Sequence, residues 1–309
     1  MPPFRFGVQL STATSGAAWR DTARRIEGLG YSTLFIPDHF EDQFGPLVAL
    51  TVAAEATTTL RVGSLVFGND YRHPVVLAKE VATLDLFSEG RFEFGLGAGW
   101  MTADYQQSGI GADPPGQRIS RMAESLAVMK SLWATGEATY HGEFYRVTGA
   151  IGRPEPVQRP HPPIIIGGGG RRVLGIAARE ADIVGVNPSL AAGAIGPEVL
   201  ATTTAEYYHQ RIEWIRQAAG PRFDQLELQC LTFLVQIVPN RDEAVAGLAA
   251  ALSLAPADVE GSPIALIGTT DQIVEVLRQR RQSFGFSYVV VHEAEIDTFA
   301  PVVAELAGT

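Results

Sequence analysis

The stretch PPIIIGGGGRR, residues 162–172, indicates most directly how this chain folds. Its three consecutive isoleucines are typical of a strand that is buried on both faces. Four glycines follow at once, and Val173–Glu180 then has the pattern of a helix. A strand, a glycine turn and a helix in this order form a βα unit, the unit from which parallel sheets are built.

The same alternation runs through the rest of the chain. The predicted strands are Phe4–Leu10, Thr33–Pro37, Leu60–Phe67, Arg91–Leu96, Pro162–Ile166, Asp182–Val186, Leu226–Val238 and Ser287–Val291. The predicted helices are Ala17–Leu29, Pro46–Thr57, Pro74–Phe87, Arg118–Trp133, Val173–Glu180, Thr204–Ala219, Asp242–Leu252, Asp271–Ser283 and Thr298–Leu306. Eight strands without a shift in composition favour an α/β fold, a (β/α)8 TIM barrel that forms one domain over residues 1–309. An open Rossmann-like sheet is the alternative.

Two segments interrupt the alternation. Residues 136–163 follow the fourth strand and are rich in Gly and Pro. Residues 187–201 follow the sixth strand and are rich in small side chains. We interpret both as insertions into the barrel, the second of them mobile.

Composition restricts the class of partner. The net charge of −10, from 24 Lys and Arg against 34 Asp and Glu, disfavours binding to nucleic acid. We find neither an apolar run of about 18 residues nor an N-terminal signal segment. The single cysteine, Cys230, cannot form an intrachain disulfide. We therefore expect a cytoplasmic protein without nucleic-acid or membrane partners, acting on a small molecule.

In a barrel of this type, functional side chains follow the carboxyl ends of the strands. Asp38 and His39 follow the second strand, and an imidazole there could hydrogen-bond or protonate a bound ring. A loop histidine satisfied by the backbone, with Asp38 as a turn residue, is an equal alternative. Arg72, after the third strand, is more typical of a salt bridge than of an anion site. The alternating glycines of GLGAGW, residues 95–100, favour close approach of a flat ligand, and Trp100 either walls a pocket or fills the core.

The glycine run 167–170 is the most informative of these positions. Backbone N–H groups at a helix N-terminus bind anions, so the run predicts a phosphate site, with a flexible loop as the alternative. The chain contains no HExxH, Walker or GxSxG motif, and its six histidines are scattered. We therefore expect no metal site, and we assign the difficult chemistry to an organic cofactor.

Many short motifs resemble the luciferase-like monooxygenase superfamily. They are FGVQL (6–10), IPDHF (36–40), LRVGS (60–64), RHP (72–74), LAKE (77–80), LDLFSEGRF (84–92), GLGAGW (95–100), PEPVQ (154–158), PPIIIGGG (162–169), AAREAD (177–182) and IGT (267–269). Together they cover almost the whole chain. Within the superfamily, the sequence is most similar to the branch that uses coenzyme F420, a deazaflavin.

The resemblance implies a set of site residues. Asp38 and His39 would lie beside the reactive ring of the cofactor. Leu65 and Val66 would form a non-proline cis peptide that supports the ring, and Gly99 and Trp100 would line it. Gly168, Gly169 and Gly170 would hold the cofactor phosphate, and Asn187 would lie near that phosphate. His39 and Trp100 would be the catalytic pair. Related sugar-phosphate dehydrogenases carry Glu where Trp100 stands and Lys where Ser189-Leu190 stand, which favours an apolar or aromatic substrate.

The resemblance thus implies an F420-dependent oxidoreductase, expected to be a homodimer. An FMN-dependent monooxygenase that uses O₂ and a separate reductase is the alternative. A barrel that binds the cofactor without catalysing a reaction is a third hypothesis.

Overall fold

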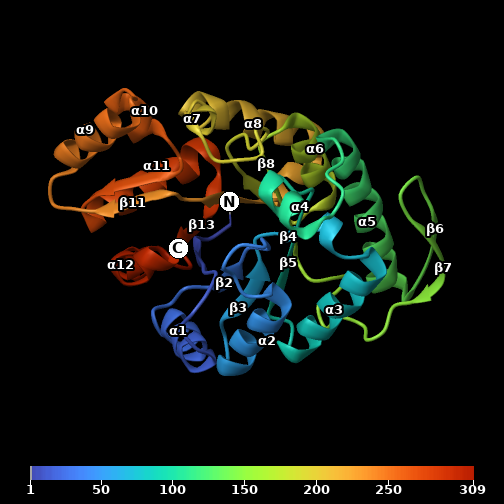
Figure 1. Ribbon diagram of the computed structural model, residues 1–309. Coiled ribbons are helices and arrows are strands. Elements are labelled where there is room, and N and C mark those ends of the chain that lie inside the picture. Colours follow the sequence, from blue (N-terminus) through green and yellow to red (C-terminus); the bar gives the residue numbers. More distant parts are fainter. Residues whose placement is uncertain (1) are drawn as a thin grey trace.

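The computed structural model describes residues 2–309 and contains a closed barrel of parallel strands (Figure 1). The barrel strands are β1 (Arg5–Gln9), β2 (Thr33–Ile36), β3 (Arg61–Ser64), β5 (Phe92–Gly97), β8 (Ile164–Gly168), β9 (Ile183–Val186), β10 (Glu227–Leu231) and β13 (Phe286–His292). They pair in this order, and β13 pairs with β1 to close the ring. The predicted (β/α)8 fold is confirmed.

Helices surround the barrel (Figure 1). They are α1 (Gly16–Gly28), α2 (Pro46–Ala56), α3 (Pro74–Phe87), α5 (Pro115–Thr135), α6 (Arg171–Glu180), α8 (Ala205–Ala219), α11 (Thr270–Phe284) and α12 (Ile296–Leu306). All lie within a few residues of the predicted bounds. Within residues 2–309, none of the helices combines the length and the apolar character needed to cross a bilayer.

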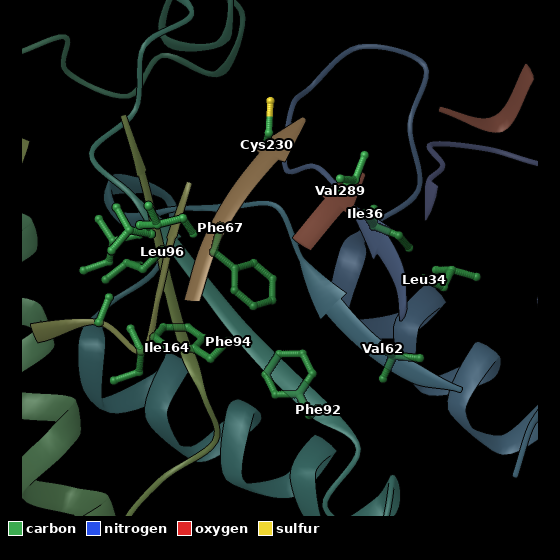
Figure 2. Packing of buried hydrophobic residues seen from close by; sticks show 14 of the residues in the cluster. Leu34, Ile36, Val62, Phe67, Phe92, Phe94, Leu96, Ile164, Cys230 and Val289 are labelled. Atoms are coloured by element: carbon green, nitrogen blue, oxygen red, sulfur yellow. The ribbon is translucent and has the colours of Figure 1, made fainter. Parts of the chain in front are cut away.

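Side chains alternate along each barrel strand between two packed regions. Figure 2 shows outward residues such as Phe94, Leu96 and Ile164, which pack between the sheet and the helices. The inward set includes Phe35, whose ring fills the space left by a glycine on a neighbouring strand. A Cβ on Gly63 would lie only 2.6 Å from that ring. The barrel interior is therefore a packed core.

The amino-terminal end of the barrel is closed by charged side chains. The carboxylate of Glu93 is fully buried and accepts hydrogen bonds from Arg5, Arg61 and the hydroxyl of Tyr288. Burial opposes its ionisation, yet Arg5 and Arg61 hold the pKa of Glu93 below its usual value. The paired charges form a polar layer beneath the apolar interior.

The insertion after β5 has regular structure of its own. It contributes the hairpin of β6 (Glu137–His141) and β7 (Arg146–Ile151), which projects beside α5 in Figure 1. The carboxylate of Glu124 on α5 accepts the backbone N–H groups of residues 143–145 and so fixes the turn of the hairpin. The insertion after β9 contains a short helix, α7 (Pro197–Leu200).

The prediction of one strand over Leu226–Val238 was wrong. After β10 the backbone changes partner: Thr232 N donates to Val290 O, whereas Phe233 N donates to Ile264 O. The chain thus leaves the barrel and forms β11 (Leu234–Ile237), which pairs in parallel with β12 (Ala265–Gly268). Helices α9 (Arg241–Leu252) and α10 (Pro256–Gly261) pack on this pair. The unit lies beside the barrel in Figure 1.

Candidate active site

The predicted site residues follow five strands that are neighbours in the barrel, β2, β3, β5, β8 and β9. Because the strands are parallel, their carboxyl ends meet at one rim. Asp38 and His39 follow β2, Leu65 and Val66 follow β3, and Gly99 and Trp100 follow β5. Gly168 ends β8, Gly169 and Gly170 follow it, and Asn187 follows β9. The structure therefore places all of them along one arc of the rim.

His39 is held by a carboxylate that the sequence analysis missed. Its Nδ1 lies 2.7 Å from Oδ2 of Asp104, on helix α4 (Thr102–Ser108). The same oxygen accepts the Tyr71 hydroxyl at 2.9 Å. Asp104 is only 1% exposed, whereas the His39 side chain is 19% exposed. The sole signal in the sequence was the position of an acid a few residues after a strand end.

Trp100 stands next to His39 because of the glycine before it. Gly99 has a φ of +75°, and a Cβ there would lie 2.0 Å from the Tyr105 hydroxyl. Only glycine fits this turn. The turn brings the indole of Trp100 to a centroid distance of 5.6 Å from the His39 ring.

Both carboxylate oxygens of Asp38 accept hydrogen bonds from other residues of the chain. Its two oxygens accept both terminal nitrogens of Arg72, at 2.5 and 3.1 Å, and one of them also accepts the backbone N–H of Gly68. Arg72 thus makes the salt bridge that its sequence context favours. With 7% exposure, Asp38 shapes the loop that carries His39 instead of presenting a free carboxylate.

The peptide bond between Leu65 and Val66 is cis, as the resemblance implied. It separates β3 from the short strand β4 (Phe67–Gly68), and the side-chain amide of Gln9 donates to Leu65 O at 3.0 Å. The side chain of Val66 occupies the space beside Gly95 and Gly97, where added Cβ atoms would lie 2.9 and 2.6 Å away from it. The interpretation of these glycines as room for a ligand was wrong, because the chain itself fills that room.

The glycine run has one open position. A Cβ on Gly168 would lie 2.4 Å from Val173, and one on Gly169 would lie 2.7 Å from the carbonyl oxygen of Asn187. At Gly170, the N-cap of α6, a Cβ would meet no atom within 4 Å. A helix N-terminus with this open space fits a phosphate.

The two glycines before this position are held by α8 and the loop after β9. The side chains of Tyr207 and Arg211 both donate to Gly169 O, at 3.3 and 3.2 Å. The backbone N–H of Asn187 donates to Gly168 O at 3.0 Å. These contacts fix the run against its neighbours, so the loop is ordered by tertiary contacts.

Curated relatives include cofactor-dependent enzymes of two kinds. An F420-dependent glucose-6-phosphate dehydrogenase of Amycolatopsis mediterranei is 30% identical, over 52% of this chain and 50% of its own. An FMNH(2)-dependent dimethylsulfone monooxygenase of Pseudomonas putida is 32% identical, over 41% of this chain and 35% of its own. An uncharacterised protein of Mycobacterium tuberculosis is 32% identical, over 53% of this chain and 65% of its own. The chain thus spans less than two thirds of the length of these relatives.

Solved structures match over nearly the full chain. A coenzyme F420-dependent tetrahydromethanopterin reductase from Methanopyrus kandleri aligns with a TM-score of 0.77 at 19% identity, covering 99% of this chain and 98% of its own. A long-chain alkane monooxygenase aligns with a TM-score of 0.78 at 15% identity, covering 99% and 91%. The profile of the family described as luciferase-like monooxygenase matches residues 1–288. On this match, the chain belongs to the luciferase-like monooxygenase family.

Proposed function

We propose that the protein is an F420-dependent oxidoreductase that transfers a hydride between the deazaflavin and a small apolar or aromatic organic substrate. The observation that carries the proposal is the open position at Gly170, on the same arc of the rim as His39 and Trp100. The F420-dependent relative supports the choice of cofactor.

The residues of the arc fit a phosphorylated cofactor with a flat ring. The backbone N–H groups at Gly170 and the dipole of α6 would hold the phosphate, with Gly168, Gly169 and Asn187 shaping the loop. Leu65 and Val66 would lie beneath the ring, and Gly99 and Trp100 beside it. The bound deazaflavin would supply hydride chemistry, which no side chain can supply.

The chain itself would bind, orient and move protons. His39, fixed through Nδ1, would hold or transfer a proton at Nε2. Trp100 would exclude water from the reacting atoms and shape the pocket. Three exposed apolar side chains lie in the segments that follow barrel strands: Phe40 after β2, Ile195 after β9 and Phe233 after β10. These segments belong to the same end of the barrel, which supports an apolar substrate.

The second candidate is an FMN-dependent monooxygenase, favoured by the similarity to the dimethylsulfone monooxygenase. Anaerobic titration with F420 and with FMN, followed by absorbance and fluorescence, separates the two. We expect F420 to bind at least about tenfold more tightly, a difference of about 1.4 kcal/mol. Equal or reversed affinities would assign the protein to the monooxygenase class.

We further propose that the protein is a homodimer in the cytoplasm. The neighbouring helices α2 and α3 expose Val48, Val76 and Phe87, and α2 carries one charged residue among eleven. Apolar exposure of this kind is typical of an interface between subunits. Light scattering on the wild type and on the double variant Val76→Glu/Phe87→Glu tests this, since the variant should be monomeric.

A further inference from the structure

We propose that Asp104 is a positioning residue that keeps the proton of the neutral His39 ring on Nδ1 and leaves Nε2 free to accept a proton. The role of His39 in catalysis rests on the proposed function. The tautomer itself follows from the contacts of Asp104 and is testable without any cofactor.

The tautomer follows from the donors that surround the carboxylate. Oδ1 of Asp104 accepts the backbone N–H of Phe40 at 3.1 Å, and Oδ2 accepts the Tyr71 hydroxyl at 2.9 Å. Burial, followed by the hydrogen bond to Asp104, raises the pKa of Tyr71 well above its usual value, so the phenol keeps its proton and donates. An ionised carboxylate only accepts hydrogen bonds. The third partner, Nδ1 of His39, must therefore donate as well.

The opposite edge of the imidazole is open. Within residues 2–309, Nε2 of His39 makes no hydrogen bond, and it does not belong to the buried polar atoms that lack a partner. The ring is partly exposed at the rim, next to Trp100. Nε2 is thus the nitrogen that a ligand can reach.

Asp104 can impose this geometry because α4 is anchored on two sides. The Tyr105 hydroxyl donates to Asp70 at 3.0 Å, and Arg121 holds the other oxygen of Asp70 at 2.9 Å. On the other side, the backbone N–H of Thr102 donates to Gly193 O at 3.0 Å. The carboxylate is thus carried by a helix that is held by side chains on one side and by the loop after β9 on the other.

The chemical consequence concerns the charged form of His39. When Nε2 takes up a proton, the carboxylate of Asp104 is already hydrogen-bonded to Nδ1 and fixed in position, so the imidazolium has an anionic partner without any rearrangement. A buried carboxylate in this position orients the imidazole and stabilises its cation. Asp104 acts only through His39, since its oxygens are covered by chain atoms.

The test is ¹⁵N NMR of protein labelled at histidine, recorded without cofactor at a pH where His39 is neutral. The spectra distinguish the Nδ1–H from the Nε2–H tautomer, and His39→Gln identifies the signal. We expect the Nδ1–H form in the wild type. In Asp104→Asn the amide N–H₂ can donate to Nδ1, so we expect the Nε2–H form there. An Nε2–H wild type, or an unchanged tautomer in Asp104→Asn, overturns the proposal.

Tyr71→Phe is the matched control, because it removes a donor from the same oxygen but keeps the carboxylate, and it should retain the Nδ1–H form. Near-ultraviolet circular dichroism reports whether each variant is folded. If Asp104→Asn does not fold, the wild-type spectrum still decides. In single-turnover hydride transfer, Asp104→Asn should slow the reaction by about 10²–10⁴-fold with cofactor affinity changed less than about threefold. Failure to bind F420 would overturn the proposed function and leave the tautomer result unaffected.

Discussion

The indole of Trp100 stands edge-on to the imidazole of His39, with ring centroids 5.6 Å apart and an angle of 84° between the planes. An edge-to-face pair of this type restrains both rings. Together with the hydrogen bond to Asp104, it leaves His39 little rotational freedom. A group restrained in this way is suited to proton transfer at one defined atom.

His39→Ala should therefore reduce catalysis more than binding. Loss of a general acid–base is typically worth about 10²–10⁴ in rate, whereas one lost hydrogen bond weakens binding by about 1 kcal/mol. Single-turnover hydride transfer at saturating cofactor measures the first effect, and a fluorescence titration the second. His39→Gln, which can hydrogen-bond but cannot carry the proton, should behave like His39→Ala in rate. A transfer rate near that of the wild type would show that His39 is a structural loop residue.

Gly170→Asp should weaken cofactor binding by at least about tenfold without loss of stability. Gly170 is the N-cap of α6 with a φ of −93°, a position where Asp and Asn are both favourable caps. The added charge would face the phosphate, whereas Gly170→Asn has the same shape without the charge and should bind better. Equal affinity in the two variants would place the phosphate elsewhere.

Gly169→Ala should lower the free energy of unfolding. The new Cβ would lie 2.6 Å from the Tyr207 hydroxyl and 2.7 Å from the carbonyl oxygen of Asn187. Overpacking of this kind typically costs about 1–3 kcal/mol. Urea unfolding should therefore show a larger loss of stability for Gly169→Ala than for Gly170→Ala, which places alanine at a helix N-cap without overpacking. A stable Gly169→Ala would mean that the loop after β9 moves aside easily.

The carboxylate of Glu27 should make stability depend on pH. Burial alone would raise its pKa, but the backbone N–H groups of Thr59, Leu60 and Thr58 lower it to about 2. Because the folded-state pKa lies below the ordinary value of 4.5, the stabilisation is complete above that value and is lost as the pH falls toward 2. Glu27→Gln should cost about 1–2 kcal/mol at pH 7 and progressively less below pH 4.5.

Urea unfolding of the wild type and Glu27→Gln at several pH values from 7 to 3 measures this difference. Glu55→Gln, an exposed carboxylate on α2, serves as the control and should change little. A wild-type advantage that stays constant down to pH 3 would contradict the assignment.

The barrel strands were predictable because they are buried on both faces and so consist of continuous apolar runs, such as Ile164–Ile166 and Val289–Val291. Because the apolar runs are continuous, the end of β10 could not be predicted from them. The apolar run continues into β11, and the break comes from a change of hydrogen-bonding partner at Thr232 and Phe233. A pattern of side chains does not record which strand the backbone will pair with.

The candidate site was predictable only in part. Residues directly after strands could be identified because the fold places every strand end at one rim. Asp104 could not, since TADYQQS, residues 102–108, has no apolar period, and its partner His39 lies 65 positions earlier. Gly95 and Gly97 were noticed as glycines, but the atoms that require them belong to Ser64 and Val66, about 30 positions earlier in the chain.

The polar layer around Glu93 makes the two ends of the barrel differ in their accessibility to a ligand. Since Arg5, Arg61 and Tyr288 block the amino-terminal end, a ligand bound at the carboxyl-terminal rim both enters and leaves from the carboxyl-terminal side.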